Sequence, residues 1–326
     1  MDIKAFIYHK RAEKYSDCQD CFGLNTQNNR IAVSDGMSQS IFPQWWAKIL
    51  VDAFLETGKI PYDNILPYQI QWQDRVRDEI AKQEAEGKNP WLLRDMFAER
   101  SGAGATICGF EWDNNGWTCQ CLGDSCLIKI KEDYTIEIIT SQKGNFDSHP
   151  DYLDSFTEGR GEPVTVSGDF NLKAILLVTD PFAELFQIHQ NDSEFISKRL
   201  NEICNLSEHE SFISLVENWR NSFNLHNDDS TLIIITDLKQ RPVNVAHEDG
   251  IEDLSKKYDP IPQKLETPLK ITKDTTNQNT SEEQKEIQSI ISVLEKANDD
   301  MTRRTLHSLI KSSKDGLTSL LNKYFK

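Results

Sequence analysis

The sequence predicts an α+β protein in which helical layers surround a sandwich of antiparallel strands. Short apolar runs separated by turn sequences fill the middle of the chain, and stretches with helical spacing lie before and after them. Strands and helices therefore come in groups, which argues against a βαβ wind, where the two kinds alternate. A length of 326 residues with 38% apolar residues is enough for a sizeable core.

The N-terminal third begins with strands and continues with helices. Residues 3–8 are apolar and predict an opening strand, and residues 30–36 predict a short buried strand that ends in an acidic turn. Apolar residues at helical spacing predict a helix over 41–55. Residues 69–86 and 91–97 are also helical in pattern and strongly charged.

The middle of the chain predicts an antiparallel meander. Four short strand-like runs lie at residues 105–110, 117–122, 126–131 and 135–140. Turn sequences separate them, including Asp-Asn-Asn-Gly at 113–116 and Gly-Asp-Ser at 123–125.

A polar loop and a second group of elements follow. Residues 141–170 are rich in Gly, Asp and Pro and predict a loop. Residues 174–179 and 231–236 predict two buried strands, and helical patterning covers 183–223 between them.

The composition changes after residue 240, which divides the chain into a domain over 1–240, a linker and a tail. Residues 241–280 contain four prolines and end in a polar run, so they predict a linker. Residues 281–326 open with a capping-box sequence and carry apolar residues at helical spacing, which predicts one or two amphipathic helices. Such a tail either docks on the domain or binds another protein.

The net charge of −16 excludes two classes of ligand. Residues 241–326 hold 14 basic and 14 acidic residues, so the domain carries the whole excess. An acidic surface repels nucleic acid and anionic lipid, so neither is expected as a primary ligand. The sequence has neither a run of 18 apolar residues nor the apolar core of a secretory signal near its start, so a cytoplasmic protein is expected.

Seven cysteines without an export signal predict reduced thiols rather than disulfides. Cys18 and Cys21 have the spacing of half a zinc site, but no second pair follows them. Cys119 and Cys121 lie two apart in an alternating run, so they are expected as small buried residues on the same side of a strand.

Four aspartates stand where a predicted strand meets a turn: Asp20, Asp35, Asp180 and Asp228. Mg²⁺ and Mn²⁺ prefer oxygen ligands, and strand ends hold such ligands rigidly. Aspartate is also common in ordinary turns, so the set and its order matter more than any single residue.

Residues 5–237 resemble the metal-dependent protein serine/threonine phosphatases of type 2C, and bacterial members in particular. Six short motifs occur in the order of that family: Cys18-Gln-Asp20, Ile31-Ala-Val-Ser-Asp35-Gly36-Met37, Gly104-Ala-Thr106, Gly123-Asp124-Ser125, Leu176-Leu-Val-Thr-Asp180 and Asp228-Asp-Ser-Thr231. Each motif alone is weak, whereas six in order are a strong resemblance.

The resemblance implies an antiparallel β-sandwich flanked by helices on both faces (αββα) and a two-metal site that activates a water for hydrolysis of phosphoserine or phosphothreonine in proteins. Asp35 would bridge two Mg²⁺ or Mn²⁺ ions, and the Gly36 carbonyl would bind one of them. Asp180 and Asp228 would bind the other ion, and Asp20 would hold bound waters. Asp124 matches a position that can hold a third ion. Asp35 and Asp20 would thus be the catalytic residues.

Some positions depart from the family pattern and leave a second function open. Pro181 replaces the usual glycine, and the phosphate-binding arginine is absent, with His9, Arg11 or Lys14 as possible substitutes. The alternative is a phosphatase-like module with little turnover that binds a phosphorylated or regulatory protein. With either function, the tail helices could recruit a protein partner such as a kinase.

Overall fold

The computed structural model describes residues 1–259 apart from 39, 145 and 147–149. The described part has a mixed α+β fold, which confirms the predicted class. Its strands are β1 (Asp2–Tyr8), β2 (Cys21–Asn25), β3 (Arg30–Ser34), β4 (Gly104–Ala105), β5 (Ile107–Trp112), β6 (Trp117–Leu122), β7 (Cys126–Ile130), β8 (Ile136–Ile139), β9 (Leu153–Asp154), β10 (Val164–Gly168), β11 (Ala174–Val178), β12 (Ser230–Thr236) and β13 (Asn244–Glu248). Its α-helices are α1 (Pro43–Thr57), α2 (Leu66–Ala85), α3 (Trp91–Ala98), α4 (Asp180–Ile188), α5 (Ser193–Cys204), α6 (His209–Ser222) and α7 (Ile251–Tyr258), and a 3₁₀ turn, η1, covers Tyr15–Asp17.

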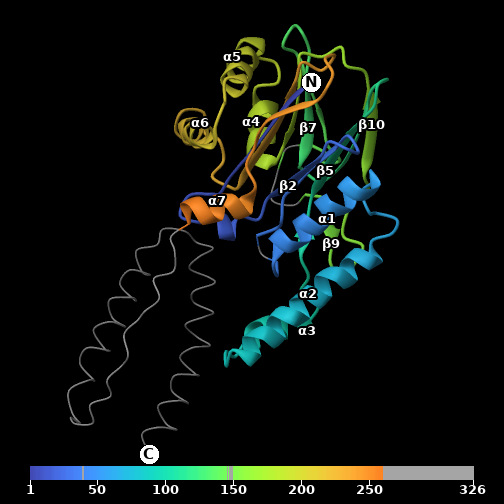
Figure 1. The fold of residues 1–326 in the computed structure, drawn as a ribbon, viewed down its shortest axis with the longest axis vertical. Coiled ribbons are helices and arrows are strands. Elements are labelled where there is room, and N and C mark those ends of the chain that lie inside the picture. Colours follow the sequence, from blue (N-terminus) through green and yellow to red (C-terminus); the bar gives the residue numbers. More distant parts are fainter. Residues whose placement is uncertain (39, 145, 147–149, 260–326) are drawn as a thin grey trace, which may run out of the picture. The chain divides into compact units, whose positions relative to one another are not determined.

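Two large sheets carry most of the strands (Figure 1). One sheet has the order β13-β1-β12-β11-β7-β8 and the other β10-β6-β5-β3-β2, while β4 and β9 form a small third sheet. Strands β1 and β13 pair in parallel, whereas the remaining pairs between the named strands are antiparallel. The predicted meander is therefore divided, because β5 and β6 belong to one sheet and β7 and β8 to the other.

Strand alternation builds the core between the two sheets. On β12, Ile233 and Ile235 join the cluster that also contains Ile31 and Val33 of β3, whereas Leu232 and Ile234 point to the opposite face. Successive side chains of a strand face opposite sides, so a strand buried on both faces is apolar throughout. This explains the unbroken apolar run of β12.

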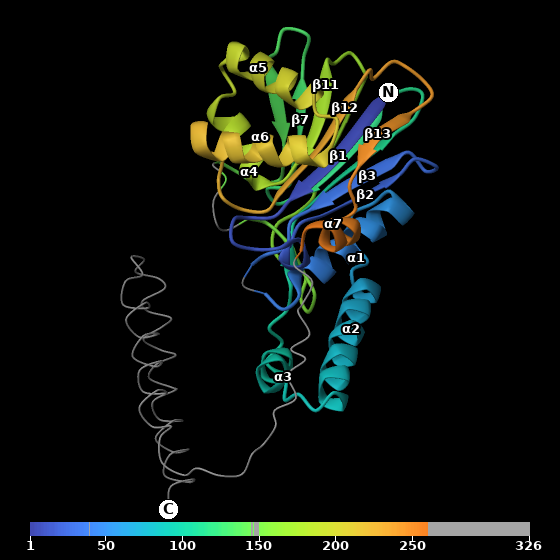
Figure 2. The same ribbon diagram turned by 60° about the vertical axis from the view of Figure 1, so that its left-hand side comes forward.

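Helices cover the outer faces of both sheets. The outer face of the six-stranded sheet packs against α4, α5 and α6, as Figure 2 shows. The outer face of the other sheet packs against α1, and α2 packs against α1 in turn. Helix α1 begins with Pro43, whose fixed φ suits a first turn, and is capped by the following Gly58, whose φ of 72° suits a left-handed cap.

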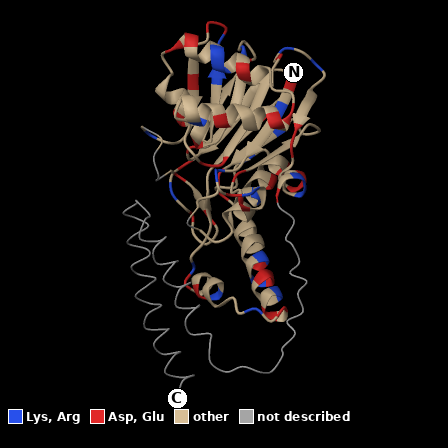
Figure 3. Ribbon diagram, turned by 90° about the vertical axis from the view of Figure 1, so that its left-hand side faces the viewer, with Lys and Arg blue, Asp and Glu red and all other residues tan. Residues whose placement is uncertain are grey.

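Helix α2 buries only a narrow apolar stripe. Trp72 and Val76 are fully buried, while the acidic and basic residues of the helix gather in its C-terminal half (Figure 3). The strands, by contrast, are mostly uncharged in the same view. These charged residues account for the strong charge of the helix predicted over 69–86.

Four strands and one helix were not predicted from the sequence, and two of the strands, β9 and β10, lie in the range 141–170 that was expected to be a loop. Strands β2 and β10 lie at the two edges of their sheet and are largely polar or half-buried, so they lack the apolar run used to recognise a strand. Residues 244–258, within the range 241–280 expected as a linker, form β13 and α7 instead. The physical reason is that β13 pairs with β1 and α7 buries Leu254 near η1. Residues 281–326, predicted as a helical tail that could recruit a partner, lie outside the described residues.

Within the described part of the chain, no helix combines the length and the apolar character needed to cross a membrane.

Candidate functional site

Five aspartates predicted as site residues lie at loops next to the central strands. Asp20 precedes β2, Asp35 follows β3, Asp124 lies between β6 and β7, Asp180 begins α4 after β11, and Asp228 precedes β12. They come close enough to affect one another's ionisation, because the other four all act on the pKa of Asp35. The structure therefore brings together residues that are up to 208 positions apart in the sequence.

The loop that carries Asp35 and Gly36 is fixed to the segment around Thr106. Thr106 N donates to the Asp35 carbonyl at 2.9 Å, and Asp35 N donates to Thr106 Oγ1 at 3.3 Å. A side chain on Gly36 would approach the main chain of Pro43 to 2.8 Å and the Gln19 carbonyl to 2.9 Å. Only glycine fits this position without movement of its neighbours.

Asp20 is buried and rigidly held by two threonines. Its Oδ2 accepts hydrogen bonds from Thr179 Oγ1 at 2.9 Å and from Thr231 Oγ1 at 2.7 Å. Its Oδ1 is buried and has no hydrogen-bond partner in the structure. A buried carboxylate oxygen without a partner is costly, so this atom is suited to a ligand that the protein itself does not provide.

Asp180 opens helix α4, and Pro181 fits behind it. The proline lies in the first turn of the helix, where the backbone N–H that it lacks would have no intrahelical partner. Pro181, in place of the usual glycine, is therefore compatible with the turn after Asp180. The negative charge of Asp180 also lies at the positive end of the helix dipole.

Asp229, which the sequence analysis did not assign, holds two segments of the site together. Its Oδ1 accepts from Lys10 N at 2.9 Å and its Oδ2 from Gln19 N at 2.7 Å. It is 2% exposed, and its neighbour Asp228 is half-buried and faces the site. Asp229 therefore holds the two segments together, whereas Asp228 is a candidate metal ligand.

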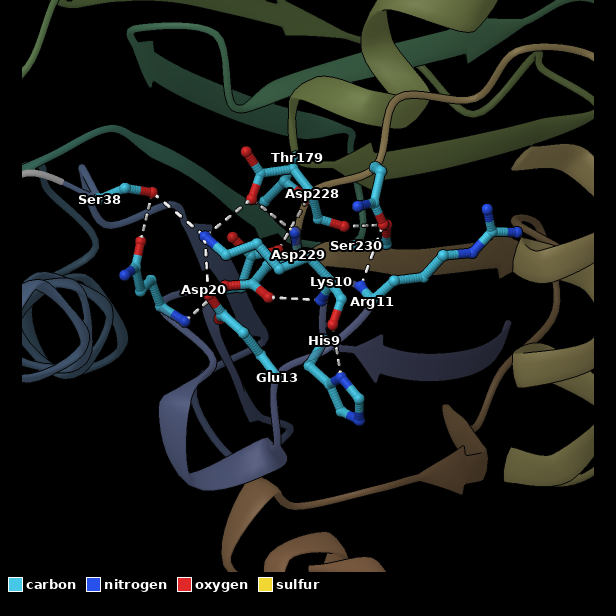
Figure 4. A network of polar contacts seen from close by, with 12 residues as sticks. His9, Lys10, Arg11, Glu13, Asp20, Ser38, Thr179, Asp228, Asp229 and Ser230 are labelled. Atoms are coloured by element: carbon cyan, nitrogen blue, oxygen red, sulfur yellow. Dashed lines mark hydrogen bonds and ion pairs between the residues drawn. The ribbon is translucent and has the colours of Figure 1, made fainter. Parts of the chain in front are cut away.

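Lys10 is the cation of the site, and the sequence analysis missed it (Figure 4). Its Nζ lies 3.5 Å from Asp228 Oδ1 and 3.4 Å from Ser38 Oγ. Arg11, one of the alternatives considered, instead pairs with Glu217 and Asn221 on α6. Nothing in the sequence distinguishes Lys10 from its basic neighbours, because its position depends on the path of the loop after β1.

Arg220, on α6, supports this arrangement from behind. Its guanidinium donates to the Asp228 carbonyl at 2.7 Å and to the His9 carbonyl at 3.4 Å, and it pairs with Glu217 at 2.9 Å. Its side chain is 1% exposed. A single buried arginine thus connects the segments that carry Lys10 and Asp228.

Burial and mutual repulsion weaken the acidity of the clustered carboxyls. Burial is the main cause that raises the pKa of Asp35 well above the ordinary value, followed by the charges of Asp20 and Asp180. The pKa of Asp20 is raised by burial and then by Asp229, against the two threonine hydrogen bonds. The pKa of Asp180 is raised by burial, Asp124 and Asp228. In the absence of a positive partner, this site opposes full ionisation.

We expect this repulsion to appear as a pH dependence of stability. In the folded state the carboxyls with raised pKa values keep protons that the unfolded chain has released, so stability falls as pH rises from about 4 toward the raised pKa values. In EDTA, the urea midpoint of the wild type should therefore fall more between pH 5 and 8 than that of Asp35→Asn. The surface variant Asp52→Asn should behave as the wild type. The same change of urea midpoint between pH 5 and 8 in all three proteins would contradict the expectation.

The donor set suits hard divalent ions. Carboxylate oxygens are the ligands that Mg²⁺ and Mn²⁺ prefer, and Asp20 Oδ1 lacks a protein partner. Among the described residues, no three of the aspartates bring their oxygens within 4.8 Å of one another; the three cysteines Cys108, Cys119 and Cys121 do so with their sulfurs. The wider spacing of the aspartates is compatible with ions that each keep several waters and use one or two carboxylates.

Comparisons with known proteins find relatives only at the level of fold. No protein-family model matches the sequence, and no curated protein is significantly similar to it. Among solved structures, the Staphylococcus aureus serine/threonine phosphatase Stp1 shares 15% identity over 72% of this chain and 94% of its own, with a TM-score of 0.48. The Mycobacterium tuberculosis serine/threonine phosphatase PstP/Ppp shares 14% identity over 71% of this chain and 96% of its own, with a TM-score of 0.44. The catalytic domain of PstP in complex with two manganese ions shares 14% identity over 71% of this chain and 96% of its own, with a TM-score of 0.42. At 14–15% identity, these are likenesses to bacterial serine/threonine phosphatases in fold alone.

Proposed function

We propose that this protein is a metal-dependent phosphatase that hydrolyses phosphoserine or phosphothreonine in proteins. The observation that carries the proposal is the meeting of five aspartates from five separate segments, one of them with a buried oxygen that has no partner. A cluster of this kind destabilises a protein that does not bind cations. The sequence motifs and the donor set both favour Mg²⁺ or Mn²⁺ as those cations.

In this proposal the aspartates have different roles. Asp35 and the Gly36 carbonyl would hold the ions from the β3 side, Asp180 and Asp228 would hold them from the β11 and β12 side, and Asp124 would be available for a further ion. Two divalent ions, when bound, activate a water and neutralise the phosphoryl oxygens. Asp20, fixed by Thr179 and Thr231, orients water in the site through its free Oδ1.

Lys10 is the residue best placed to bind the phosphoryl group of the substrate. Its ammonium lies at the edge of the carboxylate cluster and is only partly buried. Lysine binds phosphate as a compact point charge with three donors, which here contact Asp228, Ser38 and Glu13 and would turn toward an anion when it binds. Lys10 thereby takes the role for which the sequence offered only His9, Arg11 and Lys14.

The second candidate function, a module that binds without turnover, has one observation in its favour. The Lys10 ammonium lies 3.5 Å from an oxygen of Asp228, where it competes with a metal ion for that carboxylate. A phosphatase and such a module differ in turnover alone, so an assay of turnover separates them.

The deciding experiment is hydrolysis of a phosphothreonine peptide by the full chain, with and without Mn²⁺. We expect release of phosphate that depends on Mn²⁺ and stops when EDTA is added. If folded protein that binds Mn²⁺ releases no phosphate at any Mn²⁺ concentration, the module without turnover is correct and the phosphatase is not.

We expect Lys10→Met to weaken substrate binding more than turnover. Loss of one charge-assisted hydrogen bond of about 1.5 kcal/mol corresponds to a roughly tenfold higher KM for the phosphopeptide. Steady-state kinetics at saturating Mn²⁺ measures it, and the neighbouring exposed variant Lys14→Met serves as the control. A fall in kcat at unchanged KM would show that Lys10 acts on the reaction rather than on binding.

A further inference from the structure

Three cysteines converge inside the sandwich, outside the aspartate site. Cys119 and Cys121 lie on β6, and Cys108 lies opposite Cys121 on β5. Their sulfurs are 3.3 Å apart for Cys119 and Cys121, 3.3 Å for Cys108 and Cys121, and 3.7 Å for Cys108 and Cys119. All three residues are completely buried, and all three are free thiols.

The register of the two strands produces this triangle. Residues two apart on a strand point to the same face, which brings Cys119 and Cys121 together, and the cross-strand partner Cys108 completes the set. The face belongs to the core between the two sheets. The alternating run around Cys119 and Cys121 predicts that both are buried on one side of a strand, which the structure confirms, but a local pattern cannot place Cys108 beside them.

We propose that Cys108, Cys119 and Cys121 form a site for one thiophilic metal ion, with Cu(I) as the preferred ion. Soft thiolate ligands select Cu(I) and Zn²⁺ over hard ions. Sulfurs that share an ion at about 2.3 Å are themselves about 3.8 to 4.0 Å apart, so the three sulfurs need to separate by roughly half an ångström. This site is independent of the phosphatase proposal, since neither its donors nor its ion are those of the aspartates.

Charge explains why an ion rather than bare thiolates would occupy the triangle. Each new sulfur–metal bond replaces an S–H bond and releases one proton to solvent, so three bonds to Cu(I) leave a net charge of −2 in the core, less than the −3 of three bare thiolates. Zn²⁺ in structural sites takes four ligands, whereas Cu(I) accepts three sulfurs, and this difference favours Cu(I) for a triangle.

Complete burial also determines how the ion would enter. Because the folded protein covers all three sulfurs, the ion would bind while the sheets assemble and would then resist chelators. Binding of this kind adds to stability, because the unfolded chain does not hold the three thiols together. The test must therefore include folding.

The experiment is refolding of the full chain from guanidinium in a thiol-free reductant with equimolar Cu(I) or, in parallel, Zn²⁺. After passage through a column with excess chelator, bound metal is measured by elemental analysis and thiolate-to-metal charge transfer by near-ultraviolet absorption. We expect about one Cu(I) ion per chain together with a charge-transfer band, and a higher Tm than that of the metal-free protein.

Variants decide whether the three cysteines are responsible. Cys108→Ala, Cys119→Ala and Cys121→Ala should each refold, as judged by circular dichroism, but lose most of the retained ion. The half-buried and separate Cys204→Ala should retain it, and so should Asp35→Asn, which separates this site from the proposed phosphatase centre. Wild-type protein that refolds without retaining either ion, or single variants that retain it fully, would overturn the proposal.

Discussion

Asp35→Asn should abolish metal-dependent hydrolysis of the phosphothreonine peptide. Asparagine keeps the shape of the side chain but removes the charge that would bind both ions. Changes in residues that only support metal ligands cost 10–100-fold in metal affinity or activity, so loss of a bridging ligand should cost more than about 100-fold. Steady-state kinetics over a range of Mn²⁺ concentrations measures the loss and shows whether excess metal restores activity.

The same substitution should stabilise the protein when metal is absent, which separates a lost ligand from a lost fold. Burial and four neighbouring carboxylates raise the pKa of Asp35, so a neutral side chain relieves repulsion in the folded state. We therefore expect a higher Tm for Asp35→Asn than for the wild type in EDTA. Asp52→Asn, on the exposed surface of α1, should change neither activity nor Tm appreciably. An Asp35→Asn protein that is less stable in EDTA, or that keeps more than half of the activity, would contradict the proposed role.

The sequence could point to the aspartates as candidates because their signal is local. Asp35, Asp180 and Asp228 each follow or precede a strand that is apolar on both faces, namely β3, β11 and β12. A strand of this kind is recognisable from five or six consecutive residues, and the turn that follows it is recognisable from its acidic or glycine residue. Both the position and the chemistry of the candidate ligands are therefore contained in short segments.

The residues that the sequence did not predict depend on contacts between distant segments. Lys10 reaches Asp228 only because the loop after β1 is tied to Asp229, and Arg220 reaches the same region from α6. Strand β13 has a polar sequence and exists because β1 offers it an unpaired edge. Local patterning cannot reveal such partners, because the energy that fixes them comes from tertiary pairing and not from the propensity of the segment.

Arg220→Met should cost the protein on the order of 3 kcal/mol of unfolding free energy. The substitution preserves most of the apolar volume but removes the donors to the carbonyls of His9 and Asp228 and the pairing with Glu217. These acceptors lie in a region where water cannot replace the guanidinium, since the Arg220 side chain is only 1% exposed. Urea unfolding with unchanged m-value would measure the loss. The two segments should also separate, so the Mn²⁺ concentration needed for half-maximal activity should rise.

Arg11→Met is the matched control for this prediction. Both arginines pair with Glu217, but the Arg11 side chain is 44% exposed. Exposed ion pairs contribute about 0 to 1 kcal/mol, so the control should lose at most that amount and keep the metal dependence of the wild type. If the two variants lose the same unfolding free energy, the stabilising effect comes from Glu217 and not from the buried position of Arg220. A larger loss from Arg220→Met, accompanied by weaker Mn²⁺ dependence, would identify Arg220 as the residue that positions Lys10 and Asp228. Partial recovery by Arg220→Lys would support the same conclusion, because a lysine can restore one donor but cannot reach two carbonyls at once.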